Sequence, residues 1–231
     1  MSAFVSAIIV AAGGSTRMGT SDSKQFVPLL GKPAIAYTLS AFQNCDSVSE
    51  IVVVSRAQDI ERISQLAEET GCGKLSYVVE GGDCRAESVQ KGIAAVDPKA
   101  QYLAIHDGAR PLVTPEEISA VIEVAFETGA AAPGTPVTDT IKFADENNII
   151  TGTPDRSTLR AVQTPQVFEK ELYTLALSEA ETFESVTDDC SLIENMGGEV
   201  QIVEGSCENI KLTTPIDIVI AESILGKRNA V

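Results

Sequence analysis

Short apolar runs alternate along the chain with segments whose apolar residues recur every three or four positions. Such runs are typical of strands buried on both faces of a parallel sheet, and the longer period is typical of helices that cover the sheet. The apolar runs are residues 4–10, 51–55, 75–79 and 102–106. The helical segments are residues 33–42, 59–70 and 86–96. The alternation predicts an α/β fold with a mostly parallel sheet and helices on both faces.

Two later helix starts have a stronger local signal. Thr114 precedes Pro115 and lies three residues before Glu117, which is the arrangement of a capping box with proline in the first turn. Residues 214–217, Thr-Pro-Ile-Asp, have a similar arrangement. We therefore expect helices to begin at residues 115 and 215.

Residues 138–158 break this rhythm. They are polar with short alternating apolar bursts, and Asn147 and Asn148 favour a turn near residues 145–148. The pattern predicts a protruding β-hairpin arm. Because proteins usually cover the unpaired edges of a hairpin, we expect this arm to pack on a second subunit. The alternative is an ordinary surface loop.

The 231 residues suit a single α/β domain over residues 1–231, with two smaller domains as the alternative. The formal net charge of −16 disfavours nucleic acid and anionic membranes as partners, although a pocket can still gather cations for an anionic small ligand. The sequence has no run of 18 apolar residues that could span a membrane. Five scattered cysteines without a CxxC pair indicate free thiols, so we expect a cytoplasmic protein.

The candidate chemistry begins where the first predicted strand ends. Residues 11–19 read AAGGSTRMG, and Lys24 follows. Glycines directly after a parallel strand let backbone N–H groups approach a phosphate. The dinucleotide fingerprint G-x-G-x-x-G is absent, and Thr20 stands where a P-loop needs lysine. What remains is a glycine loop with two cations, Arg17 and Lys24, which can wrap a triphosphate; a structural turn with solvated cations is the alternative.

Further polar residues follow the predicted strand at residues 102–106. Asp107 and Arg110 come directly after it, at the carboxyl edge of the sheet where α/β proteins bind ligands. Lys211 lies between a strand-like segment at residues 199–204 and the last predicted helix, so it could reach the same edge. His106 is the single histidine of the chain, and we interpret it as structural.

The loop resembles that of the sugar-phosphate nucleotidyltransferases, and the whole chain resembles the 2-C-methyl-D-erythritol 4-phosphate cytidylyltransferase family. The other matching segments are Gly81-Gly82-Asp83 with Arg85 and Ser88, residues 106–111, residues 137–140, Asp155-Arg156, and residues 164–168, 187–189 and 208–213. The resemblance implies a Rossmann-like domain, a homodimer with swapped arms, CTP as donor, and Mg²⁺ or another divalent cation as cofactor. The implied reaction joins CMP from CTP to a polyol phosphate in non-mevalonate isoprenoid synthesis and releases pyrophosphate.

The resemblance also implies roles for individual residues. The implied catalytic residues are Arg17, Lys24, Arg156 and Lys211. The implied CTP-binding residues are Ala12, Gly13, Gly14, Gly82, Asp83 and Ser88. The implied substrate-binding residues are Asp107, Arg110, Thr140 and Thr164. Thr140 and Arg156 would reach across the dimer from the arm. The metal would lie mainly on the CTP phosphates, and Asp107 could help to hold it.

The implied reaction needs charge stabilisation rather than a general base. A phosphate monoester has a second pKa near 6, so it is already an anion at pH 7. Two anions must meet, and negative charge builds up on the α-phosphate and on the departing pyrophosphate. This requirement suits a chain that offers cations and only one histidine.

Two alternatives to this function remain open at this point. A ribitol-5-phosphate cytidylyltransferase shares the glycine loop and the Thr-Pro-Gln segment, but Asp155-Arg156 and Thr187-Asp188-Asp189 favour methylerythritol phosphate as substrate. A non-catalytic nucleotide-binding protein is possible on any such fold, although it would be expected to lack one of the four implied catalytic cations. A missing dinucleotide spacing disfavours an oxidoreductase.

Overall fold

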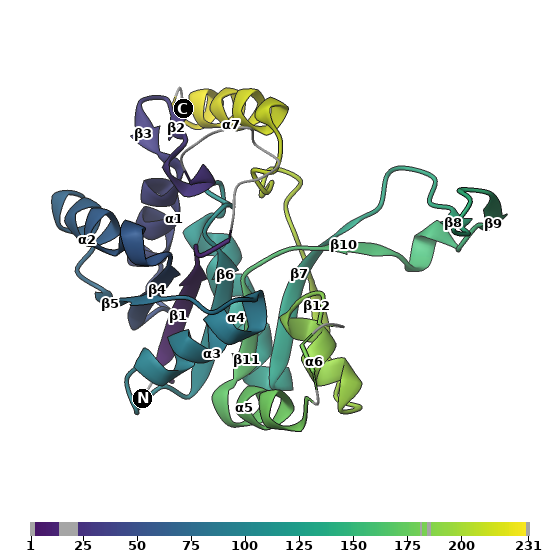
Figure 1. The fold of residues 1–231 in the computed structure, drawn as a ribbon, viewed down its shortest axis with the longest axis horizontal. Coiled ribbons are helices and arrows are strands. Elements are labelled where there is room, and N and C mark those ends of the chain that lie inside the picture. The colour runs from purple at the N-terminus through teal and green to yellow at the C-terminus, as the bar shows by residue number, and fades with distance from the viewer. Residues whose placement is uncertain (1–2, 14–22, 181, 184–185, 230–231) are drawn as a thin grey trace.

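The computed structural model describes residues 3–13, 23–180, 182–183 and 186–229 (Figure 1). Its helices are α1 (Ala34–Gln43), α2 (Ile60–Glu69), α3 (Arg85–Ala95), α4 (Pro115–Thr128), α5 (Lys170–Glu179), α6 (Asp189–Asn195) and α7 (Pro215–Arg228). Its strands are β1 (Val5–Val10), β2 (Pro28–Leu29), β3 (Lys32–Pro33), β4 (Glu50–Ser55), β5 (Leu75–Glu80), β6 (Tyr102–Asp107), β7 (Ala130–Pro136), β8 (Phe143–Ala144), β9 (Ile150–Gly152), β10 (Arg160–Val162), β11 (Gln166–Glu169) and β12 (Gln201–Glu204). Short 3₁₀ helices cover Lys24–Phe26, Ala57–Asp59 and Arg156–Thr158.

One mixed sheet forms the centre of the molecule. Its order is β10-β7-β11-β6-β1-β4-β5, and β12 also pairs with β7. Strands β5, β4, β1 and β6 are parallel to their neighbours in this series, whereas β11 runs antiparallel to both β6 and β7. The chain order along the sheet reverses between β1 and β6, as in Rossmann-like folds. The predicted α/β fold with a mainly parallel sheet is therefore confirmed.

Helices cover both faces of this sheet. Ile9 and Val53 face the core formed with α1, α2 and α4. Ile8, Val52 and Val54 point the other way, into the core formed with α3, α5 and α6. Successive residues of a strand point to opposite faces, so an almost continuous apolar run serves both cores. None of the helices in the described part of the chain is both long and apolar enough to cross a bilayer.

Helix α3 lies unusually close to the sheet. Gly92 in this helix faces the sheet, and a Cβ atom at this position would lie 2.6 Å from Ile8 Cγ2 and 2.9 Å from Val54 Cγ2. Real Cβ atoms do not approach other carbons this closely. The absence of a side chain at Gly92 therefore sets the distance between α3 and the sheet.

The two predicted capping boxes are present. Thr114 Oγ1 accepts a hydrogen bond from the Glu117 backbone N–H at 3.3 Å, and the Glu117 carboxylate accepts one from the Thr114 N–H at 2.9 Å. At α7, the Asp217 carboxylate accepts a hydrogen bond from the Thr214 N–H at 2.7 Å. These contacts satisfy backbone donors that the first turn of a helix leaves without partners.

The prediction that residues 75–79 are buried on both faces is wrong. Strand β5 ends the path through the sheet, and Tyr77 is 58% exposed. An edge strand has a neighbour on one side alone and is covered less completely than a central strand. The apolar run therefore predicted a strand correctly but not its position in the sheet.

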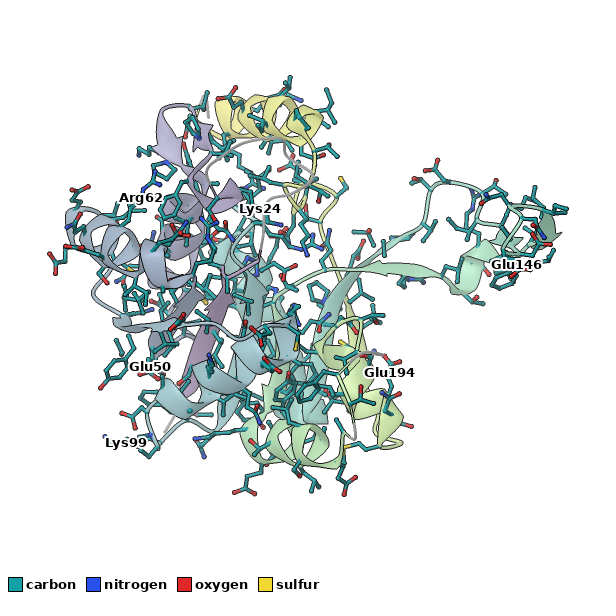
Figure 2. The ribbon with its side chains drawn as sticks, viewed as in Figure 1. Lys24, Glu50, Arg62, Lys99, Glu146 and Glu194 are labelled. Atoms are coloured by element: carbon teal, nitrogen blue, oxygen red, sulfur yellow. The ribbon has the colours of Figure 1, made fainter. Side chains whose placement is uncertain are left out.

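The hairpin expected at residues 138–158 is confirmed. Strands β8 and β9 pair antiparallel, and Asp145 Oδ1 closes the turn by accepting hydrogen bonds from the N–H groups of Asn147 and Ile149, each at 2.9 Å. The hairpin projects far from the sheet, with Glu146 near its tip (Figures 1 and 2). Phe143 is 58% exposed and Ile150 62% exposed, so the arm presents apolar side chains that the described part of the chain leaves largely uncovered.

Candidate active site

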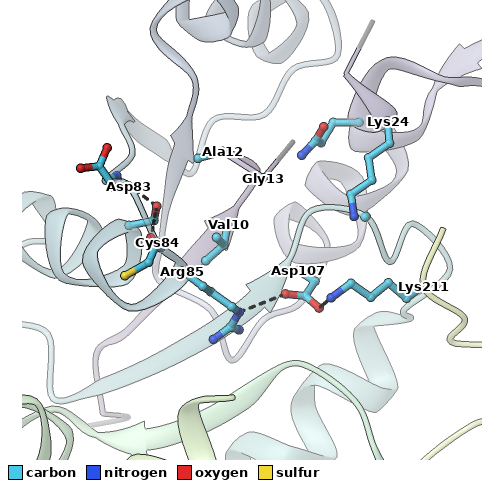
Figure 3. Close-up of a pocket in the computed structure, with 13 residues that line it drawn as sticks. Val10, Ala12, Gly13, Lys24, Asp83, Cys84, Arg85, Asp107 and Lys211 are labelled. Atoms are coloured by element: carbon cyan, nitrogen blue, oxygen red, sulfur yellow. Dashed lines mark hydrogen bonds and ion pairs between the residues drawn. The ribbon is translucent and has the colours of Figure 1, made fainter. Parts of the chain in front are cut away.

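A cavity of ≈ 230 Å³ lies at the carboxyl ends of β1 and β6, where the strand order reverses (Figure 3). Ligands of open α/β sheets bind at such a switch point. The predicted site residues that line the cavity are Ala12, Gly13, Lys24, Gly82, Asp83, Ser88, Asp107 and Lys211. Segments far apart in the sequence thus meet at one place, on the edge that the sequence predicts.

Two of the other predicted residues, Gly14 and Arg17, lie outside the described residues. The remaining four, which the structure describes, do not line this cavity. Thr164 and Arg110 lie next to Asp107: the Thr164 hydroxyl accepts a hydrogen bond from the Asp107 N–H, and Arg110 forms an ion pair with the Asp107 carboxylate. Thr140 and Arg156 belong to residues 138–158, and neither lines the cavity. This arm projects away from the rest of the molecule (Figure 1).

Asp107, the last residue of β6, is surrounded by cations. Its Oδ2 lies 2.7 Å from Lys211 Nζ and 3.9 Å from Arg110 Nε, and its Oδ1 lies 3.5 Å from Arg85 Nε (Figure 3). Burial alone would raise the pKa of Asp107, but the Arg85 guanidinium and the Lys211 ammonium together hold it well below its usual range. Asp107 is therefore a carboxylate at neutral pH, at the base of a cationic pocket.

A directed chain of hydrogen bonds lies behind Asp107. The Arg110 carbonyl can only accept, so His106 Nε2 donates to it at 3.2 Å, and Nδ1 accepts from Thr164 Oγ1 at 3.0 Å. The same Thr164 hydroxyl accepts from the Asp107 N–H at 3.1 Å. Burial lowers the pKa of His106 to about 4, so the ring is neutral. This arrangement supports the interpretation of His106 as structural and shows that the Thr164 hydroxyl is engaged within the protein.

The loop between β5 and α3 is folded tightly beside the cavity. A Cβ atom on Gly81 would lie 2.5 Å from Ala12 Cβ and 2.9 Å from Ser88 Oγ. Ser88 Oγ accepts from the Gly82 N–H at 3.1 Å and donates to the Cys84 carbonyl at 2.9 Å. The Ser88 hydroxyl therefore shapes this loop, and the small residues bring its backbone to the cavity wall.

The segment that carries Lys24 is fastened to the end of β1. Gln25 is buried, and its amide donates to the Ala11 carbonyl at 2.6 Å, while Ser23 Oγ donates to Gln25 Oε1. The Arg62 guanidinium lies 3.6 Å from the centre of the Phe26 ring, within the range of a cation–π interaction. These contacts direct the Lys24 side chain into the cavity (Figure 3).

One contributor to the site, Arg85, belongs to a matching segment of the sequence but was given no role from it. Arg85 lines the cavity and pairs with Asp107. Cys84 also lines the cavity and caps α3, because its sulfur accepts from the Glu87 N–H at 3.5 Å. The signal that could have found Arg85 is its place at the first turn of a helix directly after a glycine loop.

Comparison with known proteins identifies the family to which the chain belongs. The family model described as IspD, 2-C-methyl-D-erythritol 4-phosphate cytidylyltransferase, matches residues 5–227. The protein of that name from Caldanaerobacter subterraneus is 49% identical over 226 residues, which cover 96% of this chain and 99% of that protein. Its counterpart from Alkaliphilus metalliredigens is 42% identical and covers 97% of this chain and 94% of its own. The crystal structure of 4-diphosphocytidyl-2C-methyl-D-erythritol synthase from Anaerococcus prevotii has a TM-score of 0.86 at 31% identity and covers 97% of each chain. The chain belongs to the IspD family of 2-C-methyl-D-erythritol 4-phosphate cytidylyltransferases.

Proposed function

We propose that the cavity at the ends of β1 and β6 is where this enzyme transfers CMP from CTP to 2-C-methyl-D-erythritol 4-phosphate and releases pyrophosphate. The reaction is that of its family: CMP passes from CTP to the substrate and gives 4-diphosphocytidyl-2-C-methyl-D-erythritol. The observation that carries the proposal is the group of cations around Asp107, at the switch point of the sheet. An acidic chain with a net charge of −16 gathers Lys24, Arg85 and Lys211 in one cavity.

The chemical step needs little beyond charge and position. A phosphate oxygen of the substrate attacks the α-phosphorus of CTP and forms a new P–O bond. The bond from the α-phosphorus to the bridging oxygen breaks, and its electron pair leaves with pyrophosphate. We assign Lys24, together with Arg17, to the charge that develops on the phosphates during this exchange. Lys211 is assigned to the attacking phosphate.

The loop between β5 and α3 is assigned to the cytosine. Gly82 and Asp83 line the same cavity as Ala12 and Gly13. We assign main-chain groups of these residues to the edge of the base. Gly81 packs closely on Ala12, where a Cβ atom would lie 2.5 Å from Ala12 Cβ. By the assignment of this loop to the cytosine, a purine would clash where a pyrimidine fits, so we expect a strong preference for CTP over ATP and GTP.

We propose that residues 1–231 act as one domain and that the arm, residues 138–158, exchanges between two subunits. The exposed apolar side chains of the arm support this role, because contiguous exposed apolar groups mark interaction surfaces. Arg156 Nη1 donates to the Thr138 carbonyl at 2.6 Å, and Arg156 does not line the cavity of its own chain. In a dimer, Thr140 and Arg156 would complete the site of the partner by binding the substrate phosphate.

Mg²⁺ or another divalent cation is the proposed cofactor. Among the residues that the structure describes, no three His, Cys, Asp or Glu side chains are placed to hold a metal ion. Mg²⁺ is commonly bound by one or two carboxylates together with substrate phosphates, so Asp107 on the cavity wall fits this cation. When bound, it would neutralise phosphate charge. Asp107 would help to hold it, and the CTP phosphates would supply the other oxygens.

Pyrophosphate release tests this function directly. The assay compares 2-C-methyl-D-erythritol 4-phosphate with ribitol 5-phosphate, and CTP with ATP, in the presence of Mg²⁺. Of the combinations tested, we expect turnover for 2-C-methyl-D-erythritol 4-phosphate with CTP and for no other pair. Turnover with ribitol 5-phosphate would show that the substrate is another polyol phosphate. Equal turnover with ATP would contradict the assignment of the loop to cytosine.

A further inference from the structure

A second carboxylate lies behind the cavity, where the reaction proposed above does not use it. Asp189 is the first residue of α6 and is 1% exposed. Its Oδ2 lies 2.5 Å from Arg85 Nη1, and its Oδ1 accepts a hydrogen bond from Tyr173 Oη at 2.7 Å. Burying a carboxylate is costly unless it is paired, so its partners must explain its presence.

The position of Asp189 is fixed from the sheet. Gln166 on β11 accepts hydrogen bonds at Oε1 from the backbone N–H groups of Asp189, at 2.9 Å, and Cys190, at 3.1 Å. The Gln166 amide donates to Asp188 Oδ2 at 2.8 Å, and Asp188 Oδ1 caps the helix by accepting from the Ser191 N–H at 3.1 Å. The Thr-Pro-Gln and Thr-Asp-Asp segments of the sequence therefore meet, and together they hold the start of α6.

Arg85 connects this buried carboxylate to the cavity. Its Nη1 contacts Asp189, and its Nε lies 3.5 Å from Asp107 Oδ1. Burial would lower the pKa of Arg85, but Asp189 and then Asp107 raise it above its usual range, so the guanidinium stays charged. Arg85 thus bridges Asp107 and Asp189. Its closer contact is with Asp189, which does not line the cavity.

This division of contacts affects Asp107. A guanidinium and a carboxylate favour a bidentate pair with two short hydrogen bonds. Because Asp189 holds one end of Arg85, the guanidinium approaches Asp107 with Nε at 3.5 Å, a longer distance than its 2.5 Å contact with Asp189. The Asp107 carboxylate is therefore oriented by Arg85 without being fully occupied by it.

We propose that Asp189 is a positioning residue of the active site: through Arg85 it fixes the carboxylate of Asp107 in the orientation that the ligands need. The inference rests on the proposed function, since it requires that Asp107 faces CTP, its metal ion or the substrate. Asp189 itself touches none of them. Without its charge, Arg85 is free to turn toward Asp107 and to pair with it fully.

Asp189→Asn tests the proposal, because asparagine has the same shape and lacks the charge. We expect kcat to fall by about 10- to 100-fold, the scale of loss that a small misplacement of catalytic groups causes. The matched control is Glu194→Gln, which removes one carboxylate charge from an exposed position on the same helix, away from the contacts that hold Asp189. This variant should keep kcat within about twofold, as exposed substitutions usually have small effects.

A double-mutant cycle separates positioning from stability. In an Arg85→Met background, Asp189→Asn should change kcat by less than about twofold, because the connection to Asp107 is already lost. The same loss in both backgrounds, or an unchanged kcat in the single variant, would overturn the proposal. Thermal melting of each variant identifies any that is unfolded at the assay temperature.

Two further variants keep the test decisive. If Asp189→Asn does not fold, Arg85→Lys replaces it, since lysine keeps the charge but cannot bridge both carboxylates; an unchanged kcat in this variant would also reject the proposal. Asp107→Asn distinguishes the proposed role of Asp107 from the proposed role of Asp189. Full activity in Asp107→Asn would remove the proposed role of Asp107, whereas activity lost there and retained in Asp189→Asn would reject the role of Asp189 alone.

Discussion

Lys211 Nζ lies 2.7 Å from Asp107 Oδ2, so a residue just before α7 pairs with the last residue of β6. The Leu212 N–H donates to the Ala109 carbonyl at 2.8 Å and fixes the two segments next to this pair. The Lys211 side chain is still 41% exposed, and Lys211 lines the cavity. Lys211 can therefore keep its contact with Asp107 and meet an anionic substrate at the same time.

Replacing Lys211 by methionine should lower kcat/KM for 2-C-methyl-D-erythritol 4-phosphate by at least about a hundredfold, the typical effect of losing one preorganised donor. Methionine keeps much of the side-chain length and removes the charge. The measurement is pyrophosphate release at saturating CTP over a range of substrate concentrations. A defect confined to the KM for CTP would contradict the assignment of Lys211 to the attacking phosphate.

Lys24→Ala should lower kcat by about 10²–10³-fold, since the charge it meets develops during the reaction. Lys99→Ala is the matched control, because Lys99 is exposed and lies at the opposite end of the sheet (Figure 2). Both variants remove one positive charge from the chain, so the comparison separates a local effect from a change in overall charge. If Lys24→Ala raises KM and leaves kcat unchanged, the lysine binds CTP but does not stabilise the transition state.

Mixing two inactive variants tests the exchange of arms. If Arg156 serves the partner's site, a heterodimer of Lys24→Ala and Arg156→Ala chains has one intact site and one doubly altered site. Random exchange of equal amounts makes half of the dimers mixed, so activity should recover to about a quarter of the wild-type value. Size-exclusion chromatography with light scattering confirms the dimer. Mixtures that stay inactive after subunit exchange, or a monomeric wild type, would remove the proposal.

Stability should fall on mild acidification because His106 is buried in its neutral form. Its pKa is about 4 in the folded protein and near 6.5 in the unfolded chain, so between these values the unfolded chain binds more protons. Above pH 6.5 this histidine does not lower the free energy of unfolding. By pH 4 its preferred protonation in the unfolded chain lowers the free energy of unfolding by about 3 kcal/mol. Denaturant unfolding of wild type and His106→Gln at pH 7 and pH 4.5 measures it. Equal pH slopes for the two proteins would contradict this prediction.

The sequence predicted those parts of the fold that are determined locally. The capping boxes at Thr114 and Thr214 depend on residues three apart, and the first strands are nearly continuous apolar runs. Strands β7 and β11 were not predicted. β7 contains two prolines and a glycine, and the pairing of β11 between β6 and β7 is fixed by tertiary contacts. Periodicity contains no information about such pairing.

For the site, too, the sequence predicted the residues that stand in recognisable segments but not the contacts between distant segments. Lys24, Asp107 and Lys211 follow recognisable segments at the carboxyl edge of the sheet, and the structure brings them together. Arg85 and Asp189 lie in different segments of the chain, and in isolation each resembles an ordinary charged residue of a helix start. Their relationship exists only once α3 and α6 pack on the same face of the sheet. Arrangements of this kind cannot be predicted from spacing along one chain.

Gly92 shows how packing and electrostatics are connected in this enzyme. It lies seven residues after Arg85 on α3, about two turns along the same side of the helix. Because a methyl group at Gly92 would collide with Ile8 and Val54, any larger residue must lift α3 from the sheet. Lifting the helix would also move the guanidinium away from Asp107. The distance between the Arg85 guanidinium and Asp107 thus depends on packing in the apolar core, because the absence of a side chain at Gly92 allows α3 to lie close to the sheet.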